Sequence, residues 1–159
     1  MTEQPFTHLD ESGHARMVDV TAKEVTVRQA TATGRVLVSA EVVAGIREGA
    51  MPKGDVLAVA RIAGIQAAKR TPDLVPLCHP IAIHGVEVSV ELGDEQVDIT
   101  ATVRTADRTG VEMEALTCVA VAGLALIDMV KAVDRTASIA DIRLQAKSGG
   151  RSGDWTRPT

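Results

Sequence analysis

Residues 110–134 read GVEMEALTCVAVAGLALIDMVKAVD, and this stretch decides how the chain can fold. Small and medium apolar side chains fall on every side of a helix built from it, which predicts a helix buried on all faces. Glu112 and Glu114 stand at its start, and Asp128 and Lys131 stand near its end. Charges in a buried helix are costly unless they are paired or used, so this helix indicates a functional site.

Strands are expected on both sides of this helix. Residues 24–39 alternate between apolar and polar side chains, and the apolar parity changes near Gly34, which predicts a bulge or break there. Residues 86–103 alternate around a central Gly-Asp turn, which predicts a β-hairpin. Residues 142–147 predict a last strand.

Two helices are expected between the first strand and the hairpin. Ser39 can cap a short helix that ends at Gly49, and Asp55 can cap a second helix that ends at about Lys69. The order of elements is then strand, helices, strand, strand, helix, strand. This order predicts an α+β fold of the ferredoxin-like type, βαββαβ with an added helix, whose antiparallel sheet carries its helices on one face.

The 159 residues suit a single domain. We expect a mobile N-terminal arm over residues 1–16, the folded domain over residues 17–147, and a flexible Gly-rich C-terminal tail over residues 148–159. No signal peptide is visible, and the longest apolar run, residues 118–127, is about half of the ~20 residues that a membrane helix needs. Two cysteines are too few for a disulfide framework, so we expect a cytoplasmic protein without a membrane segment.

Composition argues against nucleic-acid partners. Seventeen basic and 21 acidic residues give a net charge of −4, and the aromatic residues are limited to Phe6 and Trp155. Nucleic-acid binding usually needs a basic surface, and single strands need aromatic stacking platforms. A core built from small apolar residues buries little area per side chain, so we expect stability to be gained through a homo-oligomer.

The charged residues of the long helix have two interpretations each. Asp128 and Lys131 are helix neighbours, which is usually a surface ion pair, but their apolar neighbours indicate partial burial, where a lysine can serve as a general acid or base. Glu112 fits a capping box with Thr109, which is favoured over a role in binding substrate, whereas a cap does not explain Glu114. Glu114 and Asp128 lie ~21 Å apart along the helix axis. We therefore predict that a ligand served by both ends lies between two subunits.

Other candidate residues lie in loops. Cys78 and His79 adjoin each other in a proline-bordered loop, where a zinc site or a Cys-His nucleophile is weakly supported and a hydrogen bond from His79 to a ligand is the better functional interpretation. Lys53 precedes a helix N-terminus, which favours an anion. Lys147 opens a Gly-rich stretch that could bind phosphate or be a disordered tail. Together these residues indicate an enzyme for a small anionic substrate.

Seven motifs in register resemble the cyclic pyranopterin monophosphate synthase (MoaC) family of molybdenum cofactor biosynthesis. They are MVDV (17–20), KGD (53–55), ARIAGIQAAKRT (60–71), LCHP (77–80), GVEMEALT (110–117), DM with KAV (128–133), and KSGG with SGD (147–154). The resemblance extends from about residue 7 to residue 155.

The resemblance implies a reaction and an assembly. A lyase of the phosphorus-oxygen type would convert 3′,8-cyclo-7,8-dihydroguanosine 5′-triphosphate, made from GTP by a radical 3′,8-cyclase, into cyclic pyranopterin monophosphate, with release of diphosphate. The assembly would be a hexamer, a trimer of dimers, with sites at subunit interfaces. The residues require no metal or other cofactor, although Mg²⁺ could accompany the triphosphate.

The resemblance also assigns roles. Asp128 would be the active-site acid, and Lys131 and Lys53 would transfer protons. The remaining site residues would bind substrate: Leu77, Cys78, His79, Met113 and Glu114 in the pocket, with Lys69 and Lys147 on the phosphates and Glu112 nearby. The rival classes are a ligand-binding regulatory module, which would bind without turnover, and a nucleotide phosphohydrolase, which would act on plain GTP.

Overall fold

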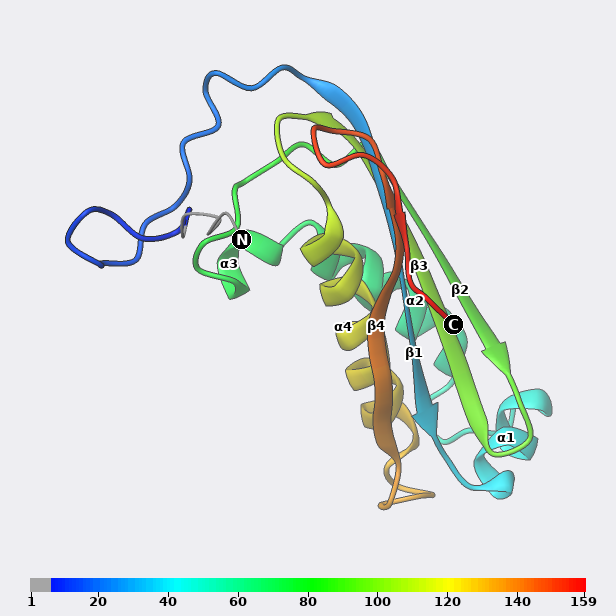
Figure 1. Ribbon diagram of the computed structural model, residues 1–159. Coiled ribbons are helices and arrows are strands. Elements are labelled where there is room, and N and C mark those ends of the chain that lie inside the picture. The colour runs from blue at the N-terminus through cyan, green and yellow to red at the C-terminus, as the bar shows by residue number, and fades with distance from the viewer. Residues whose placement is uncertain (1–6) are drawn as a thin grey trace.

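The computed structural model describes residues 7–159 and places its two longest helices against one face of a sheet (Figure 1). In chain order the elements are β1 (Thr26–Leu37), α1 (Ala40–Arg47), α2 (Val56–Ala68), α3 (Thr71–Leu74), β2 (Gly85–Leu92), β3 (Gln96–Asp107), α4 (Glu112–Val130), β4 (Ser138–Ser148) and β5 (Trp155–Thr156).

The five strands form one antiparallel sheet in the order β2-β3-β1-β4-β5. β1 is paired with β3 over its whole length, from Thr26 opposite Asp107 to Leu37 opposite Gln96. The β2–β3 hairpin therefore lies beside β1, and β4 lies on the other side of β1. This interleaving agrees with the predicted βαββαβ order, and the predicted α+β class is confirmed.

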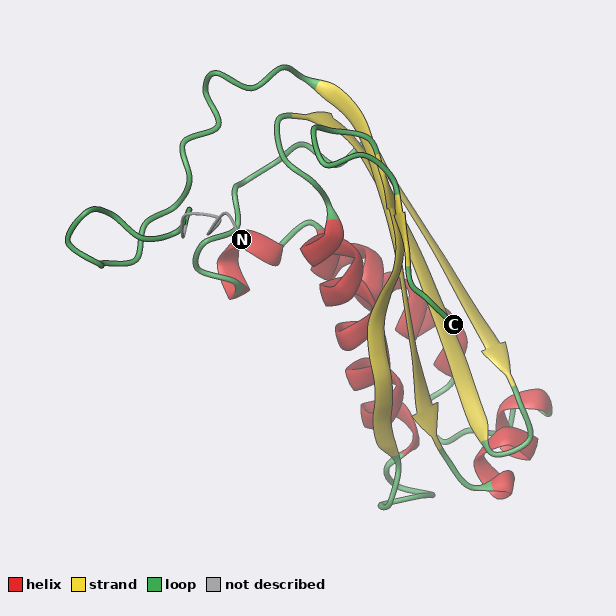
Figure 2. Ribbon diagram, viewed as in Figure 1, coloured by secondary structure: helices red, strands yellow, loops and turns green. Residues whose placement is uncertain are grey.

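α2 and α4 form the layer that covers the sheet (Figure 2). α4 packs on β1, β3 and β4, and α2 packs on β2 and along α4. The two helices approach closely where Gly64 of α2 faces α4, since a Cβ at Gly64 would lie 3.0 Å from the Cys118 carbonyl oxygen and 3.2 Å from the Ala122 Cβ. Small side chains thus set the spacing between the two helices.

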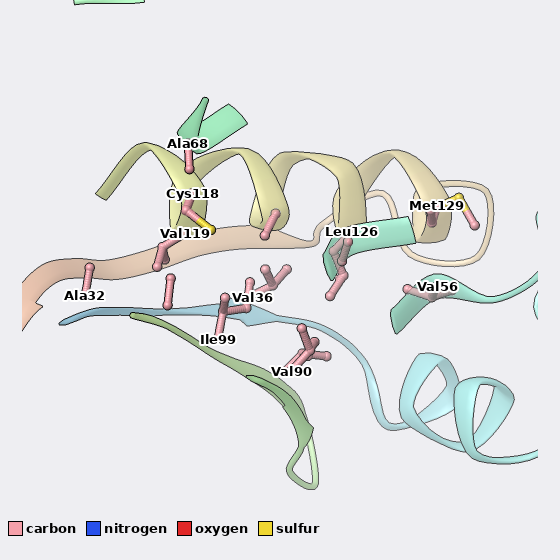
Figure 3. Close-up of a cluster of buried hydrophobic side chains, with 14 of the residues drawn as sticks. Ala32, Val36, Val56, Ala68, Val90, Ile99, Cys118, Val119, Leu126 and Met129 are labelled. Atoms are coloured by element: carbon pink, nitrogen blue, oxygen red, sulfur yellow. The ribbon is translucent and has the colours of Figure 1, made fainter. Parts of the chain in front are cut away.

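The core lies between α4 and the central strands (Figure 3). Val36 of β1 and Ile99 of β3 face Val119 and Leu126 of α4, and each of these four side chains is at most 1% exposed. Burying a side chain of this size stabilises a fold by about 1.5–3 kcal/mol. Because the core contains no buried aromatic ring among the described residues, its stability rests on many such small contributions.

α4 is not buried on all faces, which corrects the prediction for this helix. Leu124 on α4 is 60% exposed, and Ile62 on α2 is 65% exposed. The helix is long and apolar enough to cross a membrane, but its buried side chains contact the sheet and α2, as in the core helix of a folded domain. An apolar strip of the helical layer is therefore left uncovered in a single chain.

The irregularity predicted near Gly34 is confirmed, but the buried face does not change there. Thr33 is opposite Arg143 and Arg35 is opposite Ala140, so Gly34 faces two residues of β4, which is a β-bulge. Asp141 in this bulge has a φ of 55°. The early valines that suggested a flip lie on the solvent side of β1, as the 74% exposure of Val27 shows.

Of the three capping predictions, two are confirmed and one is wrong. The Ser39 and Asp55 side chains accept hydrogen bonds from the amides of Val42 and Ala58, which confirms both as N-caps. The capping box of Thr109 and Glu112 is wrong: the residue before the helix is Val111, and no side chain caps this N-terminus. Glu112 is therefore available for another partner.

The structure describes part of the predicted N-terminal arm and all of the predicted C-terminal tail. Residues 1–6 of the predicted arm lie outside the described residues, and the chain from residue 7 to β1 forms a long loop beside the helical layer (Figure 1). Within the predicted tail, Trp155 of β5 pairs with Lys147 of β4, and Arg157 Nε donates to the Leu144 carbonyl oxygen at 2.6 Å. The mobility of the arm and of the tail stays a prediction.

We predict that Gly34→Ala destabilises the protein by about 1–3 kcal/mol, the usual cost of overpacking a core. A Cβ at Gly34 would lie 2.6 Å from Val119 Cγ1 and 3.2 Å from Ile142 Cγ1, and Val119, which is buried, cannot move away without disturbing the core. Urea unfolding followed by circular dichroism measures the change.

Gly85→Ala is the matched control, because this strand glycine has only one neighbour near an added Cβ, Arg104 Cβ at 4.0 Å. It should leave the free energy of unfolding unchanged or raise it slightly. Equal stability of the two variants would contradict the packing described for Gly34.

Candidate active site

Functional side chains gather at the two ends of α4. Asp128 lies in its last turn, and Glu112 and Glu114 lie in its first turn. Because α2 runs antiparallel to α4, the loop before α2 reaches the Asp128 end and the loop after α3 reaches the Glu114 end. The structure therefore sorts the predicted residues into two groups.

The first group is a carboxylate held between two lysines. Asp128 Oδ2 accepts a hydrogen bond from Lys53 Nζ at 2.9 Å, and Asp128 Oδ1 lies 2.7 Å from Lys131 Nζ. Hydrogen bonds from Lys131 and Lys53 lower the pKa of Asp128 to about 2. The carboxylate is thus ionised at any physiological pH and fixes two ammonium groups side by side.

The partial burial predicted for this group is wrong within a single chain. The side chains of Lys53, Asp128 and Lys131 are 43%, 56% and 59% exposed. The apolar neighbours of Asp128 on α4 belong to the core or pack against it instead. An exposed ion pair is worth little to stability, roughly 0–1 kcal/mol. Stability therefore does not explain why three charges converge here.

The second group surrounds a cavity of about 450 Å³ at the other end of α4. It brings together residues from the N-terminal loop, the loop after α3 and the start of α4. The lining residues are Thr7, His8, Val18, Val20, Lys23, Leu77, Cys78, His79, Thr109, Gly110, Glu112, Met113 and Glu114. All five residues predicted to form the substrate pocket are among them.

Glu114 is the unusual group of this cavity. It is only 3% exposed, yet no cation pairs with it in the part of the chain that the structure describes. Burial raises the pKa of Glu114 to about 7, and the negative charge of Glu112 adds to the rise. Glu114 is therefore close to half protonated at neutral pH and can either donate or accept a proton.

Cys78 and His79 are held in ways that limit their chemistry. Burial raises the pKa of the Cys78 thiol, and the carboxylates of Glu114 and Glu112 raise it further, so Cys78 is not an activated nucleophile. His79 Nε2 lies 2.6 Å from the Val18 carbonyl oxygen. Since a carbonyl only accepts, Nε2 carries the hydrogen, and the Nδ1 atom of neutral His79 is left as an acceptor.

Glu112 joins the cavity to the C-terminal segment. Its Oε1 atom lies 3.1 Å from Lys147 Nζ, which also donates to Ser152 Oγ at 3.1 Å. The carboxylate folds back over Gly110, where a Cβ would overlap Glu112 Oε2. Gly110 is therefore required for the position of Glu112, and Lys147 is brought to the rim of the cavity.

Three findings complete the placement. Lys69 is exposed at the C-cap of α2 and is not among the residues that line this cavity. Lys23, which the sequence did not single out, does line it. No local pattern marks Lys23, because it is brought there by a hydrogen bond from Arg108 Nε to the Lys23 carbonyl oxygen at 3.0 Å, across 85 residues. Among residues 7–159 no cluster of three or more potential metal ligands occurs.

We predict that Glu114 makes the stability of the protein fall as pH rises. In the unfolded chain the carboxyl ionises near pH 4.5, but in the folded state it keeps its proton up to about pH 7. Between these values the folded state binds the extra proton, so raising the pH favours unfolding. Relative to Glu114→Gln, the wild type should lose about 2–3 kcal/mol from pH 5 to pH 8, measured by urea unfolding.

Glu95→Gln is the control for this experiment, because Glu95 is exposed on the β2–β3 turn. Its pH profile should run parallel to that of the wild type. If the Glu114→Gln profile is parallel as well, Glu114 does not titrate as its burial requires.

Comparison with known proteins shows the family of this chain. The model of the MoaC family matches residues 17–150. A cyclic pyranopterin monophosphate synthase of Streptomyces griseus is 64% identical over 156 residues, which cover 98% of this chain and 88% of the relative. Relatives of that name from Nocardioides sp. and, as synthase 2, from Mycobacterium tuberculosis are 61% and 60% identical, covering 99% and 96% of this chain and 100% and 91% of their own. The chain therefore belongs to the MoaC family.

Proposed function

We propose that this protein is a cyclic pyranopterin monophosphate synthase of molybdenum cofactor biosynthesis. The substrate is 3′,8-cyclo-7,8-dihydroguanosine 5′-triphosphate, and the products are cyclic pyranopterin monophosphate and diphosphate. The single observation that carries the proposal is the convergence of Lys53, Asp128 and Lys131, three exposed charges that contribute little to stability and that suit proton transfer. The names of the relatives support the same reaction.

The lysine pair performs the proton transfers in this proposal. Opening the imidazole ring of the purine and closing the pyran ring both require protons to be moved between ring nitrogens, carbons and hydroxyl groups. Asp128 stays ionised and accepts a hydrogen bond from each ammonium group, so it positions both lysines without taking their protons. Each lysine then has further N–H groups that can reach the substrate.

The cavity at the other end of α4 binds the substrate. Leu77, Cys78, His79, Met113 and Glu114 line it, and its volume of about 450 Å³ is in the range of small-ligand sites. Glu114 is suited to bind an edge of the base that carries both donors and acceptors, because its carboxyl exists in both protonation states near neutral pH. Lys147 at the rim and the exposed Lys69 at the C-cap of α2 bind phosphate oxygens in this proposal, with Glu112 nearby.

Both groups serve one substrate only if they come from two subunits. They occupy opposite ends of a 19-residue helix, which is about 28 Å long at 1.5 Å per residue. The exposed Leu124 and Ile62 supply an apolar surface that an oligomer would cover. The hexamer, a trimer of dimers, is the assembly that we propose on the basis of the family resemblance.

The remaining parts of the proposal concern the surroundings of the reaction. We expect a cytoplasmic enzyme that acts after a radical GTP 3′,8-cyclase and has no membrane or nucleic-acid partner. We expect no cofactor to be required, with Mg²⁺ accompanying the triphosphate at most. Activity after dialysis against a chelator tests this expectation.

We predict that the purified protein releases diphosphate and forms pterin from the cyclised triphosphate, and that Lys131→Ala loses at least about 100-fold in kcat, as expected when an acid–base group is removed. Phosphate and pterin assays with the purified substrate measure both. Arg135→Ala is the matched control, because Arg135 is an exposed cation four residues further on. It should retain full activity.

The same assay separates the rival functions. Tight binding of the cyclised triphosphate without turnover would indicate a regulatory binding module. Release of phosphate or diphosphate from plain GTP would indicate a nucleotide phosphohydrolase. Either result would overturn the proposed reaction.

We predict that Glu114→Ala and Lys131→Ala are each inactive alone and that mixed oligomers regain activity. In a mixed dimer, one of the two shared sites combines the intact Glu114 end of one subunit with the intact Lys131 end of the other. Refolding the two variants together should therefore restore up to about a quarter of wild-type activity, if chains mix at random. Lack of restoration in verified mixed oligomers would show that the site lies within one chain.

A further inference from the structure

A buried carboxylate lies three residues beyond Lys131 and takes no part in the chemistry described so far. Asp134 is only 8% exposed, and no cation of the described residues lies within ion-pair distance of it. Burying an ionised carboxylate is costly unless hydrogen bonds replace the water that it loses. The hydrogen bonds of Asp134 must therefore compensate for this cost.

Both oxygens of Asp134 accept hydrogen bonds, and they accept them from different parts of the chain. Oδ1 accepts from the Thr136 amide at 2.8 Å and from the Thr136 hydroxyl at 2.7 Å. Oδ2 accepts from the Ser39 amide at 2.8 Å, across 95 residues. The hydrogen bonds from Thr136 and from Ser39 lower the pKa of Asp134, so the carboxylate stays ionised near neutral pH. Asp134 thus joins the turn after α4 to the residue that begins α1.

One end of this link lies in the turn that carries Lys131. Lys131 N donates to the Ile127 carbonyl oxygen at 2.9 Å. Asp134 N donates to the Val130 carbonyl oxygen at 3.0 Å, which folds the chain after Lys131 against the end of the helix. Because both amides bond to the last turn of α4, Asp134 has a fixed position relative to Lys131.

The other end of the link is attached to the segment that carries Lys53. Ser39 is the N-cap of α1. The chain that leaves α1 folds back onto it, since Ala50 N donates to the Gly45 carbonyl oxygen at 2.9 Å. The buried Met51 packs on Gly45, where a Cβ would lie 2.8 Å from Met51 Sδ. Lys53 follows two residues later, so a displacement of α1 would displace Lys53 as well.

Few polar contacts connect these two parts of the chain. One part runs from Ser39 to the start of α2, and the other runs from the last turn of α4 to the start of β4. Among the described residues, the hydrogen bonds that join them are those from Ser39 to Asp134 and from Lys53 to Asp128. Apolar packing also joins them, but it is not directional, whereas a hydrogen bond to a buried carboxylate constrains both distance and angle.

We propose that Asp134 is a positioning residue, which holds Lys53 and Lys131 at the two oxygens of Asp128 by tying the turn after α4 to α1. Asp134 neither binds substrate nor transfers a proton in this role, because it acts through the two lysines. The reaction that the lysines serve rests on the proposed function, but the link itself can be tested without that reaction.

A matched pair of substitutions at Ser39 breaks the link without changing Asp134. The φ of Ser39 is −70°, a value that proline adopts, so Ser39→Pro removes the amide hydrogen at little cost to the backbone. It also removes the hydroxyl that caps α1. Ser39→Ala removes the same hydroxyl but keeps the amide. The difference between the two variants therefore separates the bond to Asp134 from the lost cap.

We predict that Ser39→Pro lowers kcat for the cyclised triphosphate about 10- to 100-fold relative to Ser39→Ala, the usual effect of misplacing reacting groups by about 1 Å. KM should change little, because the substrate cavity lies at the other end of α4. Asp134→Asn should behave like Ser39→Pro, since an amide has one acceptor oxygen and sets its NH₂ group against a donor. Thr136→Val, which keeps the bond to Ser39, should retain most of the activity.

The surroundings of the two lysines can be measured without the reaction. Reductive methylation with isotope-labelled formaldehyde places an NMR label on all five lysines and keeps their charge. Arginine substitutions assign the signals of Lys53 and Lys131. In Ser39→Pro, but not in Ser39→Ala, these signals should move toward that of Lys69, which is exposed and forms no ion pair among the described residues.

The two proposals fail separately. A wild type without synthase activity would reject the reaction, while the lysine signals would still decide whether the link positions the lysines. Equal kcat and equal lysine signals in Ser39→Pro and Ser39→Ala would reject the positioning role. Urea unfolding of every variant completes the test, because lower stability with unchanged kcat in Asp134→Asn would show that Asp134 supports only the fold.

Discussion

The close antiparallel packing of α2 along α4 is the contact on which both candidate sites depend. Gly64 allows the two backbones to approach at Cys118 and Ala122. Because the helices then run side by side, the loop before α2 delivers Lys53 to Asp128, and the chain after α2 delivers Cys78 to the cavity at Glu114. A larger residue in place of Gly64 would push α2 and α4 apart and would also displace the residues at their ends, because a close-packed interior transmits a change of volume.

Lysine and arginine are used differently in this chain. Its five lysines are Lys23, Lys53, Lys69, Lys131 and Lys147. Lys23 lines the cavity, Lys147 pairs with Glu112 of the cavity, and Lys53 and Lys131 pair with Asp128 at the other end of α4. The twelve arginines serve many structural contacts, such as Arg61 to the Val88 carbonyl oxygen and Arg104 to Glu87. A lysine can exchange its proton at accessible pH, whereas arginine cannot, so this division is the one that proton-transfer chemistry favours.

Sequence patterns predicted the helices and strands well where the apolar residues follow one clear periodicity. The hairpin, the caps at Ser39 and Asp55 and the long helix follow from local rules, and family motifs identified the cavity residues. Local sequence patterns failed where a contact with a distant part of the chain determines the position of a side chain. Glu112 looked like a capping residue, but it pairs with Lys147, and the alternation that suggested a flip in β1 reflected valines on its open face. Lys23 gave no signal, because its position depends on Arg108, 85 residues away.

The division of charge between the two ends of α4 has a consequence for assembly. Asp128 and its lysines are exposed in the single chain, and two ammonium groups beside one carboxylate leave a net positive charge. At the cavity end, Glu112 is paired with Lys147, whereas the buried Glu114 has no cation beside it among the described residues. Docking the lysine end of one subunit over the cavity of another would therefore bring two ammonium groups to a carboxyl that has no cationic partner of its own, and it would remove water from both.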